Sequence, residues 1–137
     1  MSTAQERIVL AARAALGVRF RLHGRDMAHG FDCVGLVAHA LRAGGFCGAV
    51  PSGYALRGGD AAKMAAHLSA AGLVPARMAR AGDVVLFATG PAQFHLAIDT
   101  GGSIIHADAV LRRVVERPGS GAWPIIGRWQ PLTDADF

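Results

Sequence analysis

One cysteine in this sequence has the position that thiol chemistry requires. Cys33 follows Asp32 at the start of the apolar helical pattern CVGLVAHAL. A thiol attacks a carbonyl as its thiolate, and the unpaired N–H groups and dipole of a helix N-terminus favour that negative charge. The same N–H groups can bind the oxyanion of a tetrahedral intermediate. This position favours a nucleophile, while a buried structural thiol is the usual role of a single free cysteine.

Two histidines lie in neighbouring segments with strand patterns, FHLAID and SIIHAD. A two-residue turn at Gly101-Gly102 is the connection that a Gly-Gly pair favours. It would pair Ala97 with His106 and His95 with Asp108, and would place both imidazoles on one face with their α-carbons about 7–8 Å apart. A slip of one residue would turn His106 to the other face. The turn chemistry therefore predicts two adjacent histidines.

A relay is the chemistry that these residues allow. Cys33 would be the nucleophile, His95 the base and His106 the residue that orients His95, with Asp108 in reserve for that last role. There are two alternatives to the relay. One is a pair of half-buried strand histidines with satisfied hydrogen bonds, and the other is a zinc site. None of the short ligand spacings of zinc sites appears, which disfavours a metal. The relay requires no metal and no organic cofactor.

The elements that must position this chemistry are helices first and strands afterwards. Asp32 is a plausible N-cap, while Gly17 and Gly44-Gly45 are plausible helix stops. We expect helices over residues 4–16, 33–43 and 60–72. From Gly82 the pattern changes to short strands, over 83–88, 94–99, 103–108, 110–116 and 125–129. Helices packed on an antiparallel meander form an α+β fold.

Composition limits the classes of partner. The chain has 137 residues, 52% of them apolar and 18% charged, which indicates one globular domain. The net charge of +4 comes from scattered arginines without a basic run, so nucleic acid is disfavoured and an anionic polymer such as cell wall is favoured. No segment could insert into a membrane, and the N-terminus lacks the apolar stretch of a signal peptide. We therefore expect cytoplasmic synthesis. Cys47 is expected to be a buried, inert thiol.

Four motifs in order, GFDCVGLV, AGDVVLF, FHLAID and IIHAD, resemble the NlpC-type family of cell-wall cysteine peptidases. The resemblance covers roughly residues 5–130 and implies a single papain-like peptidase domain over residues 1–137. It also implies that Cys33 is the nucleophile, His95 the base and His106 the third residue. The implied substrate is a peptidoglycan stem peptide, cut at the amide between D-γ-glutamate and the diamino acid. Such an enzyme would act at the cell wall.

The chain departs from the family's motifs at three positions. Val34 stands where a serine commonly follows the nucleophile, and there the backbone is usually what matters. Phe20 stands where a tyrosine hydroxyl often hydrogen-bonds the nucleophile, which could leave Cys33 less well poised. His23 replaces a glycine and could take a polar role near the site. Gly35 would let a substrate approach the backbone. The candidate substrate-binding residues are Phe20, His23, Val34, Gly35, Tyr54 and Asp108.

The later part of the chain, from VPSGYALRGG to VVERPGSGAW, looks more like the family branch encoded with phage tails and phage-like gene transfer particles. Tail proteins are then possible partners, because a particle would carry an enzyme without a signal peptide to the wall. Two other functions stay open. One is a non-catalytic tail or wall-binding module that kept the fold, which the loss of the tyrosine at Phe20 favours. The other is a thiol acyl-transfer enzyme acting on lipid or protein amides, and the absence of a membrane-seeking segment argues against lipid.

Overall fold

The computed structural model describes residues 3–48, 60–119 and 123–131. Tyr54 lies outside these ranges. The helices are α1 (Ala4–Ala14), α2 (Cys33–Ala43) and α3 (Ala61–Ala70). The strands are β1 (Arg25–Asp26), β2 (Gly30–Phe31), β3 (Leu73–Pro75), β4 (Val84–Gly90), β5 (Gln93–Asp99), β6 (Ser103–Asp108), β7 (Arg113–Pro118) and β8 (Ile125–Pro131). The α+β class predicted from the sequence is confirmed.

Each of the three helices in the described ranges begins at a side chain that accepts a backbone N–H. Thr3 and Glu6 form a capping box on α1, which the sequence analysis did not anticipate. Asp32 caps α2 and Asp60 caps α3, each by accepting the N–H three residues on. The predicted range of α2 is confirmed, and α1 and α3 each end two residues earlier than predicted. Local capping therefore decides where Cys33 stands.

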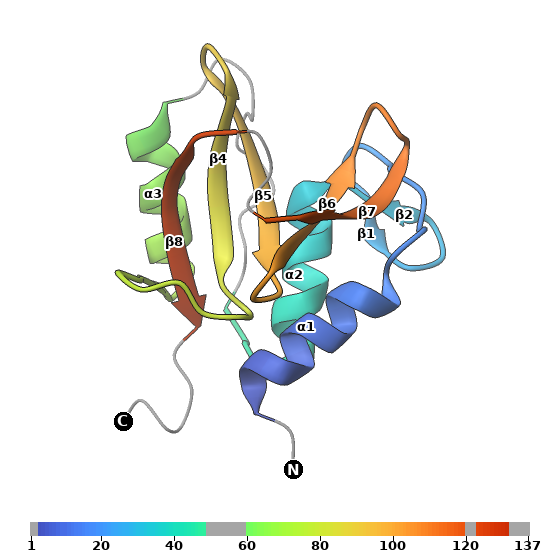
Figure 1. Ribbon diagram of the computed structural model, residues 1–137, viewed down its shortest axis with the longest axis horizontal. Coiled ribbons are helices and arrows are strands. Elements are labelled where there is room, and N and C mark those ends of the chain that lie inside the picture. Colours follow the sequence, from blue (N-terminus) through green and yellow to red (C-terminus); the bar gives the residue numbers. More distant parts are fainter. Residues whose placement is uncertain (1–2, 49–59, 120–122, 132–137) are drawn as a thin grey trace.

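A six-stranded antiparallel sheet in the order β3-β8-β4-β5-β6-β7 forms the other layer. The predicted meander holds for β4 to β7, where each strand pairs with the next. It is wrong for β8, which returns across the sheet and pairs with β4 on one side and β3 on the other (Figure 1). The short strand β3 was not predicted.

The start of β7 differs from the prediction by three residues. The carboxylate of Asp108 accepts the N–H groups of Val110 at 2.8 Å and Leu111 at 2.9 Å, and so holds a turn there. Val110 is 90% exposed and β7 starts only at Arg113. Apolar residue type alone suggested a strand from residue 110, and the side-chain-to-backbone bonds of Asp108 override it.

The two faces of the sheet carry different groups. The main core, between sheet and helices, includes Leu96, Ile98 and Ile105 together with Cys33 and its neighbours on α2. The helix α2 packs on β5 and β6, while α3 packs on β3 and β8 (Figure 1). The other face carries a small cluster of Val85, Phe87, Ala97 and Ile104, against which Trp123 packs.

None of the helices in the described ranges is long and apolar enough to cross a membrane.

Candidate active site

The first half of the candidate site is the start of α2, where Asp32 binds the preceding loop as well as the helix. One carboxylate oxygen accepts the N–H of Gly35 at 2.8 Å and the guanidinium of Arg25 at 2.6 Å. The other accepts the backbone N–H of His23 at 2.9 Å. Asp32 was predicted as an N-cap, and it is also the residue that ties loop and helix together beside Cys33.

Gly35 is required for loop packing. A Cβ at this position would lie 2.0 Å from the carbonyl oxygen of Gly24, so the loop backbone occupies the space that a side chain would need. The expected approach of a substrate to the Gly35 backbone stays a prediction. The side chain of Val34 is 4% exposed and lies in the main core, so that only its backbone is a candidate for substrate contact.

The thiol of Cys33 is buried and uncharged at neutral pH. The residue is 2% exposed. Burial raises the pKa of the thiol to about 12, and the nearby charge of Asp32 raises it further. Backbone hydrogen bonds from Leu96 and from the start of α2 lower the pKa by less than burial raises it. In this structure desolvation therefore outweighs the helix-terminus effect that predicted a thiolate.

The second half of the site is the β5–β6 hairpin, whose predicted register is confirmed at its turn. Ile98 pairs with Ile105 and Asp99 with Ile104, as a two-residue turn requires. The ladder between these strands ends there, so His95 and Asp108 are not a paired couple. Because the two strands stop pairing at Ile98, their outer ends form a seam without a backbone ladder, and the histidines lie along it. His106 is nevertheless only 1% exposed.

The two imidazoles are in direct contact, as the sequence predicted. His95 Nε2 lies 2.8 Å from His106 Nδ1, and the ring planes are nearly perpendicular at 89°. Arg117 Nε then donates to His106 Nε2 at 3.0 Å, and Arg117 Nη2 donates to Asp108 Oδ2 at 2.9 Å. Asp108 therefore binds Arg117 and the turn amides, and its reserve role as a direct partner of His95 is not seen.

The histidines are held in their neutral form. Burial, and next the charge of His106, lower the pKa of His95 to about 3. Burial also lowers the pKa of His106 to about 4, with Asp108 and Arg117 acting in opposite directions on it. Trp123 lies edge-on to both rings, with centroid distances of 5.5 Å to His95 and 5.4 Å to His106. This indole covers the histidine pair.

The structure brings the two histidines together but forms no hydrogen bond between Cys33 and either ring. His95 is paired with Phe87 across β4 and β5, so its side chain shares the face of the small cluster. Cys33 belongs to the main core on the helix side. The backbone of Leu96, which follows His95 in β5, acts on the pKa of the thiol. The sulfur therefore lies close to this strand.

Two other candidate residues lie in the loop before α2. Phe20 is half-buried and packs against the main core, without the hydroxyl that the family's tyrosine would supply. His23 is exposed and has a φ of 62°, the left-handed conformation that favours glycine, which accounts for the glycine of the family motif. Its backbone binds Asp32, and no polar role of its ring near Cys33 is seen.

Sequence reasoning missed Arg117 and the role of Trp123. Arg117 pairs with Ile104 across β6 and β7, so it shares a face with His106, two residues further along β6. A strand predicted over 110–116 ended before it. The available signal was an arginine on the strand next to His106, although β7 carries two, Arg113 and Arg117.

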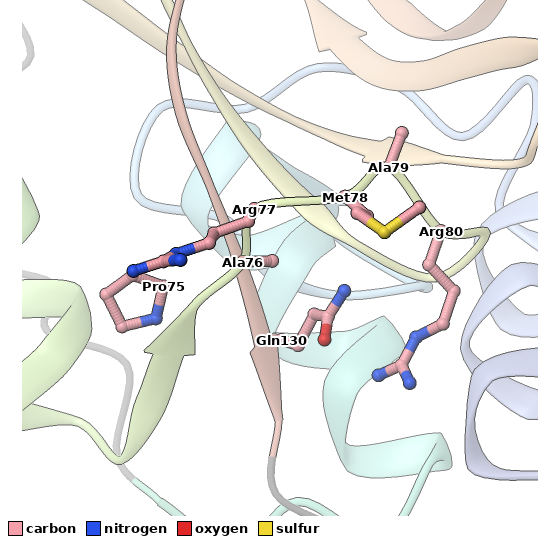
Figure 2. A pocket seen from close by; sticks show the side chains of 7 residues that line it. All are labelled: Pro75, Ala76, Arg77, Met78, Ala79, Arg80 and Gln130. Atoms are coloured by element: carbon pink, nitrogen blue, oxygen red, sulfur yellow. The ribbon is translucent and has the colours of Figure 1, made fainter.

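The hollows described in the structure lie elsewhere. One of about 410 Å³ is bounded by the β3–β4 connection and Gln130, with Arg77, Met78 and Arg80 around it (Figure 2). A second of about 190 Å³ lies by the β5–β6 turn and Arg128. Neither is lined by Cys33, His95 or His106.

Among the described residues no group of three His, Cys, Asp or Glu side chains could hold a metal ion. Cys47, predicted to be buried, is exposed.

Comparison with known proteins gives a consistent result. The NlpC/P60 family profile matches residues 17–123. The NlpC/p60 domain of the peptidoglycan hydrolase SagA is 24% identical with a TM-score of 0.60, over 83% of this chain and 88% of that one. The peptidoglycan hydrolase RipB from Mycobacterium tuberculosis is 22% identical with a TM-score of 0.58, over 93% and 63%. RipD from the same organism, described as a non-catalytic domain adapted to peptidoglycan binding, is 18% identical with a TM-score of 0.62, over 96% and 100%. No curated protein matches the chain. The matches identify a papain-like fold.

Proposed function

The chain belongs to the NlpC/P60 family, and from this premise we propose that it is a cysteine peptidase that hydrolyses amide bonds in peptidoglycan stem peptides. The observation that carries the proposal is the hydrogen-bonded pair of His95 and His106 beside a helix that begins with Cys33. In this proposal residues 1–137 act as one peptidase domain. The net charge of +4 suits an anionic polymer.

The proposed reaction begins from uncharged groups. Cys33 Sγ attacks the amide carbonyl as its proton passes to His95, and the N–H groups at the start of α2 stabilise the oxyanion. His95 then protonates the leaving amine, and water hydrolyses the thioester. Because thiol and imidazole are both neutral in the free protein, proton transfer accompanies the attack. Substrate binding must also bring sulfur and imidazole together at the seam.

Two finer parts of the proposal rest on the resemblance between the sequence motifs and the family. The bond cut is the amide between D-γ-glutamate and the diamino acid. The protein acts at the cell wall after delivery by a phage tail or phage-like particle, with tail proteins as partners. The bond would be identified by comparing a defined stem peptide that contains this amide with the same peptide in which a non-hydrolysable isostere replaces it.

The test of hydrolysis compares wild type with Cys33→Ala on purified muropeptides, with products identified by mass spectrometry. We expect cleavage by wild type and none by Cys33→Ala. Cys47→Ala is the matched control, because Cys47 is an exposed thiol outside the site and its loss should leave cleavage unchanged. Cleavage that persists in Cys33→Ala, or no cleavage by wild type, would overturn the proposal. A chelator should have no effect.

A non-catalytic wall-binding module is the second candidate function. The buried thiol, which forms no hydrogen bond with His95, favours it, and RipD is a structural relative described in those terms. In that case wild type and Cys33→Ala would co-sediment equally with insoluble peptidoglycan and neither would release products. Sedimentation and product release together distinguish the two functions.

A further inference from the structure

We propose that Arg117 is a positioning residue that sets the tautomers of both histidines and, while bound to His106, keeps the proton of His95 on Nδ1, the nitrogen left free for Cys33. The inference rests on the proposed function only in its consequence for catalysis. The tautomers themselves follow from the hydrogen bonds between Arg117, His106 and His95.

The first step concerns His106. A guanidinium has only hydrogen-bond donors, so the 3.0 Å contact from Arg117 Nε requires an acceptor at His106 Nε2. A neutral imidazole has one donor and one acceptor nitrogen, and the hydrogen bond at one nitrogen determines the other. The ring is neutral, because burial lowers its pKa to about 4. His106 therefore carries its proton on Nδ1.

The second step concerns His95. With a proton on His106 Nδ1, the 2.8 Å contact between the rings runs from His106 to His95, and His95 Nε2 is the acceptor. His95 is also neutral, so its own proton lies on Nδ1. Arg117 thus determines the direction of every hydrogen bond from β7 to β5.

The third step is the chemical consequence. A protonated Nδ1 can donate to a thiolate but cannot take the proton of a thiol. The opposite direction, with His95 Nε2–H donating to His106 Nδ1, leaves His95 Nδ1 free to act as base. The proton between the rings then moves to His95 Nε2, His95 Nδ1 releases its proton to water, and His106 Nε2 takes one from water. The total number of protons is unchanged, but Arg117 must leave His106 Nε2.

Arg117 is placed so that it can leave. Its side chain is 43% exposed, and besides His106 it has an ion pair with Asp108 and a guanidinium 6.0 Å from the Trp123 ring centre. Ion pairs of such exposed arginines are weak. The bound arrangement is thus a resting state of the relay, and departure of Arg117 converts His95 into a base.

The test measures which ring nitrogens carry protons, by long-range ¹H–¹⁵N NMR of ¹⁵N-labelled wild type and of Cys33→Ala with and without Arg117→Met. With Arg117 present we expect protons on Nδ1 of both histidines and bare Nε2 atoms. In Arg117→Met we expect a population with protons on both Nε2 atoms. Arg13→Met is the matched control, because Arg13 is 45% exposed and its carboxylate partner is Glu116, so its loss should change neither histidine.

A proton on His106 Nε2 while Arg117 is present would overturn the inference, and this measurement needs no folded variant. Unchanged tautomers in a folded Arg117→Met protein would overturn it as well. The readout does not depend on activity, so absence of cleavage in the muropeptide assay would contradict the proposed function and leave the tautomer assignment standing.

Discussion

The start of α2 and the outer end of the β5–β6 hairpin are built by different interactions. Around Cys33 the side chains of the main core are apolar, and the charged pair of Asp32 and Arg25 beside it holds loop and helix together. Around His95 every polar contact belongs to a chain that runs through His106 and Arg117 to Asp108. The first region is a packed core with a thiol in it, whereas the second is a preorganised polar relay.

This difference separates stability from chemistry. Substitutions at the start of α2 act on core and loop packing, so they should change the free energy of unfolding. Substitutions in the relay act on hydrogen-bonded groups outside the main core, so they should change activity more than stability. The predictions below test that separation.

The largest effect is expected from His95→Ala. Loss of the proposed base should lower kcat by about 10²- to 10⁴-fold on muropeptides. The free energy of unfolding should fall by about 1–3 kcal/mol, since a nitrogen of buried His106 loses its hydrogen-bond partner and Trp123 loses a ring contact. His39→Ala is the control, because His39 lies on α2 and its ring packs against Phe31, outside the relay. A His95→Ala enzyme with wild-type kcat would remove the relay from the mechanism.

Asp32→Ala should have the largest effect on stability. It removes the cap of α2 and leaves Arg25 and the N–H of His23 without their acceptor. We expect a loss of about 3 kcal/mol in the free energy of unfolding, measured by urea denaturation. Asp32→Asn keeps an acceptor for the cap and should lose less. Equal stability of the two variants would show that the capping acceptor contributes nothing beyond the ion pair with Arg25.

The relay should make the protein less stable in mild acid. The pKa of His106 is about 4 in the folded protein and 6.5 in the unfolded chain. Between these pH values the imidazole of His106 therefore binds a proton in the unfolded chain and stays neutral in the folded protein. Stability is therefore fully present above pH 6.5 and falls as the pH drops towards 4, by about 2 kcal/mol at pH 5. His106→Asn should show a weaker dependence in urea titrations at several pH values. A steeper dependence in that variant would contradict the assignment.

Much of the site could be predicted because its determinants are local. Asp32 before an apolar helical pattern gives the start of α2, and the Gly101-Gly102 turn gives the register that places His95 near His106. Both follow from side-chain-to-backbone bonding and turn conformation. These features act within a few residues of the side chains that they position.

The rest depends on contacts that local patterns do not contain. Cys33 was expected to be poised as a thiolate, but the depth of its burial comes from packing between α2 and the sheet. The space beside Gly35 is taken by Gly24, from a loop whose path no periodicity describes. Arg117 could not be placed beside His106 from the sequence. The turn held by Asp108 makes β7 begin three residues later than predicted.

The return of β8 to the middle of the sheet also bears on how the chain folds during synthesis. The edge of β4 that faces β8 has no partner until residues 125–131 have left the ribosome, although β4 to β7 can already pair. An unpaired edge on a hydrophobic strand invites pairing with other chains. A nascent chain stalled before residue 125 should therefore aggregate or recruit chaperones, and completion of the sheet should be a late step in folding.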